Sequence, residues 1–219
     1  MNPVIKVERD DILREDEVNE MLRKAEGLYK GKMIQCLIAL LWLFGKRISE
    51  TIRLRRKDIW IDDNYLYVRF RVLKKKSRKA KPKLESRIKK ITLKNPYVVY
   101  VLQYIRSIKN PNAYIFPGNT RPKIVTVKRK LPDGTVKTYQ YEYKEGGHIS
   151  REYAYRLLKE LNPDVWCHLF RESVATLWAE HGATEEKLMH WFDWDRADTA
   201  HKYVKRGTRL IEDMAERNW

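Results

Sequence analysis

The sequence predicts a mainly α-helical α+β domain with a small antiparallel β-sheet on one side and an inserted β-hairpin. Three features indicate this class. Residues 32–44 are apolar nearly throughout, which is typical of a helix at the centre of a core. Apolar and polar residues alternate over 65–72, which indicates a half-buried strand, and the turn sequence Pro132-Asp133-Gly134 lies between two β-rich arms. A chain of 219 residues fits one domain.

The first half of the chain contains the predicted central helix and the sheet. Ahead of this helix, apolar residues spaced three and four apart predict an amphipathic helix: Val18, Met21, Leu22, Ala25 and Leu28. Gly45 ends the central helix, and a short helical segment is expected within 47–56. From 59 to 93 the period changes to two, which predicts antiparallel strands joined by a long lysine-rich turn. One face of the first long strand carries Leu66, Val68, Phe70 and Val72.

The second half of the chain predicts further helices and the hairpin. Helices are expected at 97–108, 150–161, 168–180 and 184–192, the last of which opens with Thr184 as its N-cap. The hairpin covers 123–143, where Pro132 fixes φ and Gly134 accepts a positive φ. A final apolar stripe is formed by Leu210, Ile211, Met214 and Ala215. It is too short to stabilise a free helix, so it is expected to fold against an apolar groove.

The composition points to a phosphate-bearing partner. The chain has 46 Lys and Arg against 29 Asp and Glu, a formal net charge of +17, and a folded domain this basic most often binds nucleic acid or an anionic membrane surface. The longest unbroken apolar run, 36–44, is too short to cross a bilayer, and acidic residues interrupt the N-terminal segment, so neither a membrane span nor a signal peptide is expected. The expected compartment is the cytoplasm.

Cofactor chemistry is not expected. Cys36 and Cys167 are the two cysteines, and they offer neither a disulfide framework nor a paired-cysteine zinc site. The glycines do not have the spacing of a phosphate-binding loop. We therefore expect no metal and no cofactor.

A small set of residues, far apart in the sequence, could perform chemistry on a phosphodiester. His168 and Arg171 are three apart on a predicted helix, so an imidazole and a guanidinium would share one face. Arg47, at a helix entry, could supply a second guanidinium. Two arginines would neutralise the charge that grows in a five-coordinate phosphorus transition state, and a tyrosine could then act as the covalent nucleophile.

The order of these residues resembles the tyrosine recombinase (phage integrase) family. The resemblance is based on Gly45-Lys46-Arg47-Ile48-Ser49-Glu50, His168-Leu169-Phe170-Arg171, and Phe192-Asp193-Trp194 nine residues ahead of Tyr203. It covers 12–203, in the family's order. It extends to integrases of archaeal mobile elements, and with the high Lys, Arg and Glu content it suggests a thermophilic source.

The resemblance implies a role for each motif residue. Tyr203 would attack the scissile phosphate, Arg47 and Arg171 would bind its nonbridging oxygens, and His168 would assist by proton transfer or hydrogen bonding. Trp194 would occupy the family's second His or Trp position and donate one hydrogen bond, with His190 as the alternative. Glu50 would orient the arginines. The general acid would be a lysine at the sheet turn, Lys74 or alternatively Lys76, and the DNA-binding residues there would be Lys75, Lys76, Arg78 and Lys79.

The sequence departs from the family pattern at three places, one of which is Cys167, since it precedes His168 where the family frequently has proline. Phe192-Asp193-Trp194 stands where the family commonly has Leu-Gly-His, although Asp tolerates a left-handed backbone better than most residues. The hairpin at 123–143 looks like an insertion. We expect residues 1–219 to form a single catalytic domain without the usual N-terminal DNA-clamping domain, ending in a C-terminal exchange segment at 204–219.

The function expected from these residues is site-specific DNA recombination through a 3′-phosphotyrosyl intermediate and a Holliday junction. The partners would be a double-stranded attachment site and three further copies of the chain, which would exchange C-terminal segments on DNA and separate into monomers without it. The expected location is the cytoplasm, in association with the nucleoid. The alternatives are a non-catalytic DNA-binding protein of the same fold and a strand-passing enzyme similar to type IB topoisomerases.

Overall fold

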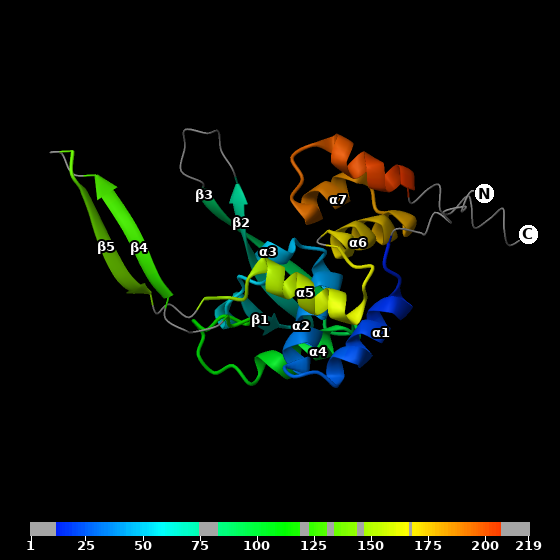
Figure 1. Ribbon diagram of the computed structural model, residues 1–219. Helices are drawn as coiled ribbons and strands as arrows, with labels where there is room; N and C mark the ends of the chain where they lie inside the picture. Colours follow the sequence, from blue (N-terminus) through cyan, green and yellow to red (C-terminus); the bar gives the residue numbers. More distant parts are fainter. Residues whose placement is uncertain are drawn as a thin grey trace, which may run out of the picture.

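The computed structural model describes residues 12–74, 83–118, 123–130, 134–143, 147–166 and 168–206. Its elements follow in this order (Figure 1): α1 (Glu15–Glu26), α2 (Gly31–Phe44), α3 (Ile48–Thr51), the 3-10 turn η1 (Arg56–Asp58), β1 (Ile59–Asp62), β2 (Tyr65–Lys74), β3 (Lys83–Thr92), α4 (Val98–Ile105), β4 (Lys123–Lys130), β5 (Val136–Tyr143), α5 (Arg151–Leu161), α6 (Leu169–Glu180) and α7 (Glu185–Phe192). Residues 197–206 form one more helix. The predicted α+β class, rich in helix with a small sheet, is confirmed.

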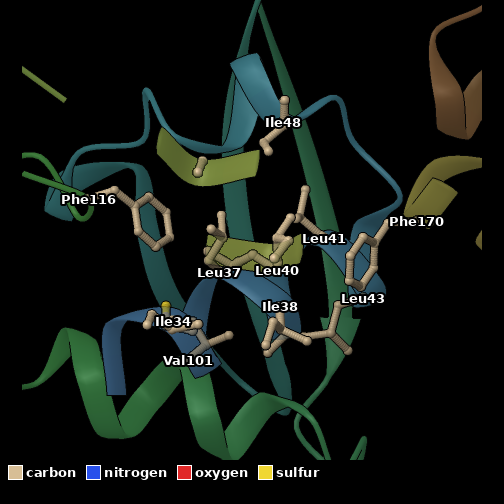
Figure 2. Close-up of a cluster of buried hydrophobic side chains, with 14 of the residues drawn as sticks. Ile34, Leu37, Ile38, Leu40, Leu41, Leu43, Ile48, Val101, Phe116 and Phe170 are labelled. Carbon is tan, nitrogen blue, oxygen red and sulfur yellow. The ribbon is translucent and has the colours of Figure 1, made fainter. Parts of the chain in front are cut away.

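Helix α2 is the centre of the core. From Met33 to Phe44 every side chain except the half-buried Trp42 is buried, and α2 packs against α1, α4 and α6. Figure 2 shows its side chains among Ile48, Val101, Phe116 and Phe170, which come from four other segments. The prediction of a helix buried nearly all round is confirmed, because a helix without a polar face is stable only inside a core.

Gly45 ends α2, as predicted, and it does so in a left-handed conformation. Its φ is +56°, and its N–H donates to the Leu41 carbonyl. A Cβ at this position would lie 2.5 Å from Cε1 of Phe192, the last residue of α7. Both the backbone conformation and the close approach of α7 therefore require glycine here.

The three-stranded sheet is antiparallel in the order β1-β2-β3. Leu66 pairs with Ile91, and Val68 pairs with Lys89. The predicted inward face of β2 is confirmed for Leu66, Val68 and Phe70, which are fully buried. Phe70 meets Phe44 of α2 edge to face, with ring centroids 5.4 Å apart. The sheet is therefore fixed to the central helix by its inner face.

The predicted hairpin is also present. β4 and β5 form a separate two-stranded sheet, which stands apart from the helices in Figure 1. Gly134 has a φ of +85°, as the turn requires, whereas Pro132 and Asp133 lie outside the described residues. At the base of the arm, the Gly118 N–H donates to the Gly147 carbonyl at 2.7 Å. The chain thus leaves and re-enters the helical body at neighbouring points.

The last helices surround a second, smaller apolar cluster. Ser150 and Thr184 cap α5 and α7, since their side-chain oxygens accept from backbone N–H groups. The cluster contains Val174, Ala175, Leu188, Phe192 and Ala200. Ala200 belongs to the helix at 197–206, which the sequence did not predict. None of the helices in the described ranges is long and apolar enough to cross a membrane.

Candidate active site

Arg47 is held at the entrance of α3 by Glu50. The Glu50 carboxylate accepts from the Arg47 backbone N–H at 3.1 Å and from Arg47 Nη1 at 2.9 Å. The Arg47 side chain keeps 42% of its surface exposed, while Glu50 is almost covered. The carboxylate thus fixes both the backbone and the guanidinium of Arg47. An orienting role for Glu50 stays a prediction, and this contact is what that role requires.

Arg171 lies inside the protein and joins two distant segments. Only 6% of its surface is exposed. Nη1 donates to the Gly45 carbonyl at 3.1 Å, and Nη2 donates to the Phe192 carbonyl at 2.6 Å. The guanidinium carbon also lies 5.3 Å from the centroid of the Trp194 ring. Arg171 therefore fixes the end of α2 against the end of α7, one residue away from Asp193 and two from Trp194.

Tyr203 belongs to a stack of three aromatic rings. Trp194 lies between Phe192 and Tyr203, with centroid distances of 4.8 Å and 5.0 Å and interplanar angles of 19° and 8°. Tyr203 projects from the helix at 197–206. The indole thus forms a flat surface against which the phenol ring is packed. Stacking of this kind restricts the rotation of a tyrosine side chain.

The charges around Arg171 show which residues share the site. Burial and the nearby positive charge of Arg47 lower the pKa of Arg171 to about 10, while Glu50, Tyr203 and Asp193 act in the opposite sense. Burial and the Glu172 carboxylate raise the pKa of the Tyr203 phenol, against the effect of Arg171. Arg47 and Tyr203 are therefore each close enough to Arg171 to interact with it electrostatically. Two guanidinium groups beside a phenol form a site suited to an anion.

His168 lies at the very start of α6. The helix α6 begins at Leu169, and His168 is its N-cap residue, with an exposed side chain. Within the described part of the chain, no hydrogen bond or ring contact joins its imidazole to Arg171 or Tyr203. As the N-cap residue, His168 stands three positions before Arg171 at the start of α6, and a shared role of the two side chains stays a prediction.

The predicted lysines of the sheet turn lie mostly beyond the described residues. Lys74 is the last residue of β2 and pairs with Lys83 of β3, and nothing is described of its side chain. The alternative general acid Lys76 and the predicted DNA-binding residues lie outside the described ranges: Lys75, Lys76, Arg78 and Lys79. Their roles stay predictions.

Sequence reasoning missed a buried cluster of charges beside this site. Lys46 is 1% exposed, and its Nζ lies 2.5 Å from Asp193 Oδ2. Lys89 is 6% exposed, and its Nζ lies 3.3 Å from Asp193 Oδ1. Although burial raises the pKa of Asp193, the two lysines hold it below its usual value. Asp193 adopts the expected left-handed conformation, with φ of +54°.

A cavity of about 470 Å³ opens next to this cluster. Its lining includes Arg87, Lys89, His190, Asp193 and Trp194. Among the described residues, no group of three or more His, Cys, Asp or Glu side chains is arranged to hold a metal ion. The charged side chains of the lining are Arg87 and Lys89 together with Asp193 and Asp195.

Among the comparisons with known proteins, a family model gives a family and the solved structures give a fold. A model of the phage integrase family matches residues 11–208. A comparison with curated proteins found no match. Among solved structures, the XerA recombinase has a TM-score of 0.60 at 15% identity, covering 95% of this chain and 66% of that one.

Two further structures of this kind contain DNA. The XerH site-specific recombinase in a post-cleavage complex with a difH substrate has a TM-score of 0.56 at 14% identity, covering 93% of this chain and 52% of that one. The Tn1549 transposon integrase in complex with transposon right end DNA has a TM-score of 0.54 at 16% identity, covering 96% of this chain and 67% of that one. At these identities the likeness shows the fold. The present chain spans about half of the XerH chain.

Proposed function

The chain belongs to the phage integrase family, and on this premise we propose that it is a site-specific DNA recombinase with Tyr203 as its nucleophile. The observation that carries the proposal is the stack of Tyr203 on Trp194, with the guanidinium of Arg171 beside it and that of Arg47 nearby. A positioned phenol next to two arginines is the arrangement that nucleophilic attack on a phosphodiester requires.

In the proposed reaction, Tyr203 Oη forms a bond to phosphorus and the bond from phosphorus to the 5′ oxygen breaks. Arg47 and Arg171 bind the nonbridging oxygens, where negative charge grows in the transition state. Because burial raises the pKa of Tyr203, the phenol keeps its proton at neutral pH and must release it during attack. His168 assists by accepting this proton or by hydrogen bonding to the phosphate. Lys74, or alternatively Lys76, gives a proton to the leaving 5′ oxygen.

The product is a 3′-phosphotyrosyl bond, which stores the energy of the phosphodiester for rejoining. Attack on it by the 5′ hydroxyl of a second duplex forms a Holliday junction, and a second round of cleavage completes recombination. Trp194 holds Tyr203 by stacking and donates an indole hydrogen bond to the phosphate. Glu50 keeps Arg47 in place.

The proposed DNA surface combines the site with the lysine-rich turn between β2 and β3. A net charge of +17 favours attraction to duplex DNA and release of its counterions. The DNA named for the XerH and Tn1549 structures supports this partner. The protein would act in the cytoplasm, on DNA of the nucleoid.

We also propose a tetramer on DNA that is assembled by exchange of the segment 204–219, of which the structure describes residues up to 206. Ending the chain after Arg206 should leave DNA binding and cleavage at one site intact, because the charged site is retained. Recombination of two duplexes should fall, since the copies lose the segment that links them. Recombination at the full-length rate by the shortened protein would contradict the exchange.

The decisive test uses a duplex with a nick close to the cleavage site. On cleavage, the short fragment that carries the 5′ hydroxyl dissociates, so it cannot reverse the reaction and the covalent intermediate accumulates. With candidate attachment sequences, we expect a protein–DNA adduct on Tyr203, located by mass spectrometry, with or without a metal chelator. Tight binding without any adduct would favour the non-catalytic DNA-binding protein. If the protein forms the adduct and relaxes supercoiled DNA but never joins strands of two duplexes into a recombinant product, the topoisomerase-like enzyme would be favoured.

A further inference from the structure

The end of α7 is bound by cations from three other parts of the molecule. Successive carbonyls of this helix each accept one bond of 2.6 Å: His190 from Lys89 Nζ of β3, Trp191 from Lys46 Nζ after α2, and Phe192 from Arg171 Nη2 of α6. We refer to Lys46, Lys89 and Arg171 as the cation cap. The last carbonyls of a helix have no partner within the helix and carry partial negative charge, so cations bind well there.

Three buried cations in one place repel one another. Lys89 and Arg171 both lower the pKa of Lys46, in addition to the larger effect of burial. Asp193 provides the compensating charge, since its two carboxylate oxygens contact Lys46 and Lys89 separately. Leaving one member of such a buried group without its partner is strongly destabilising. The carboxylate is therefore what allows the two lysines to remain inside.

The cation cap connects the segments that carry the candidate catalytic side chains. Lys46 directly precedes Arg47 in the chain, and Arg171 is itself one of these side chains. Asp193 directly precedes Trp194, on which Tyr203 is stacked at 5.0 Å. A shift at the end of α7 would thus move the indole and the phenol relative to both arginines.

We propose that Asp193, together with Lys46 and Lys89, is a positioning residue that sets the Trp194–Tyr203 stack against Arg47 and Arg171. The inference rests on the proposed function. In the proposed reaction Asp193 does not contact the phosphate. It acts indirectly, by fixing the end of α7 and the Trp194 indole that follows it. A displacement of about 1 Å at a reacting group lowers a rate on the order of 10²-fold.

The test compares two buried carboxylates. Asp193→Asn removes the negative charge while retaining a residue that tolerates a left-handed backbone. The matched control is Asp58→Asn: Asp58 is fully buried, accepts from Arg71 at 3.0 Å and 3.1 Å, and lies in η1, which takes no part in the site. Both substitutions should lower the temperature of unfolding.

Single-turnover cleavage of the nicked duplex at saturating DNA separates the two variants. We expect Asp193→Asn to slow cleavage about 10²-fold while DNA affinity stays within about twofold of the original protein. Asp58→Asn should cleave at the original rate. The inference is overturned if the two variants cleave equally fast when folded.

A second variant covers the case in which Asp193→Asn does not fold. Lys46→Met/Lys89→Met/Asp193→Gly replaces the two lysines together with their aspartate and leaves Arg171 in place, so that no lysine or carboxylate of this group is left buried without its partner. We expect this protein to fold and bind DNA but to cleave about 10²-fold more slowly, because two α7 carbonyls lose their donors. Cleavage at the original rate would refute the positioning role.

A spectroscopic measurement tests the inference without any reaction. In protein labelled with 5-fluorotryptophan, the fluorine resonance of Trp194 is identified by its loss in Trp194→Phe. It should shift or broaden in Asp193→Asn and stay unchanged in Asp58→Asn. An unchanged resonance in both variants counts against the inference. If the original protein forms no adduct with DNA, the proposed function fails, and this measurement still decides whether Asp193 positions the indole.

Discussion

The two clusters of buried side chains are held together in different ways. Around α2 the interior is large and almost entirely apolar. Around α6, α7 and the helix at 197–206 the apolar cluster is small, and buried charges and stacked rings make up the rest of the contacts. Apolar packing is strong but has no direction, whereas hydrogen bonds and ion pairs fix angles. The first cluster therefore gives stability, and the second gives orientation to the candidate catalytic groups.

Replacing one tyrosine in each cluster should separate stability from cleavage completely. Tyr203→Phe removes the attacking oxygen and no cation, so covalent adduct formation should vanish while DNA binding and unfolding temperature stay nearly unchanged. Tyr97→Phe removes a hydroxyl bonded to Glu15 and Asn19 in the first cluster. It should lower stability by about 1 kcal/mol and leave cleavage unchanged. Gel detection of the adduct and urea unfolding measure the two effects; an adduct with Tyr203→Phe would place the nucleophile elsewhere.

Replacing either arginine should slow cleavage to a similar extent, but the two variants should differ in their free energy of unfolding. Arg47→Ala and Arg171→Ala should each lower single-turnover cleavage about 10²-fold, because each removes a donor to developing charge. Arg171→Ala should also destabilise the fold by about 1–3 kcal/mol, since it leaves the Gly45 and Phe192 carbonyls without their donor. Arg47→Ala should lower the unfolding free energy much less, because the Arg47 side chain is 42% exposed. Equal unfolding curves for the two variants would contradict the structural role given to Arg171.

Shortening one leucine in each cluster sharpens the comparison. Leu40 of α2 and Leu188 of α7 are both fully buried. Leu40→Ala should cost about 2–5 kcal/mol in unfolding free energy, with the cleavage rate of the folded protein retained. Leu188→Ala should cost less, because a small cluster can open locally, and should slow cleavage by loosening α7. Chemical denaturation and single-turnover cleavage distinguish the two. Slower cleavage by folded Leu40→Ala would show that packing in the first cluster also affects the candidate catalytic groups.

The last expected effect is a pH dependence of stability that is confined to the second cluster. The pKa of Lys46 is lowered from its ordinary 10.5 to about 8: burial is the largest cause, Asp193 opposes it, and Lys89 and Arg171 add to the lowering. Between these two pH values the unfolded chain holds more protons than the folded one, so the unfolding free energy should rise with pH. This rise should disappear in Lys46→Met, as measured by denaturation at pH 8 and pH 10. The same rise in both proteins would assign it to other groups.

Sequence patterns predicted the first cluster better than the second. The uniform apolar run of α2 follows from burial of this helix on all sides. The alternation of apolar and polar residues in β2 follows from burial of one face of this strand. The helix at 197–206 was missed because few of its residues are apolar. Lys46 and Lys89 were missed because lysine is normally exposed. One signal was available: Lys89 has the same strand parity as Ile91, which packs against the core.

The candidate site was predictable as a set of residues but not as a geometry. Arg47 and Tyr203 each interact electrostatically with Arg171, and Glu50 contacts Arg47. The role of His168 stays a prediction, because its place as the N-cap residue of α6 does not by itself decide what the imidazole contacts. Spacing along a chain also cannot show that the guanidinium of Arg171 binds carbonyls of two other segments.

At the base of the β4–β5 arm the two ends of the inserted segment lie side by side, so the length of the arm can change there. Gly118 and Gly147 are joined by a backbone hydrogen bond, and a Cβ on Gly118 would lie 2.6 Å from the His148 carbonyl. Because the two ends already meet, the entropy of closing a loop there grows only slowly with the number of residues inserted. Shorter or longer arms can therefore be exchanged at this point, and a reporter peptide can be grafted between these glycines without redirecting the path of the chain through either cluster.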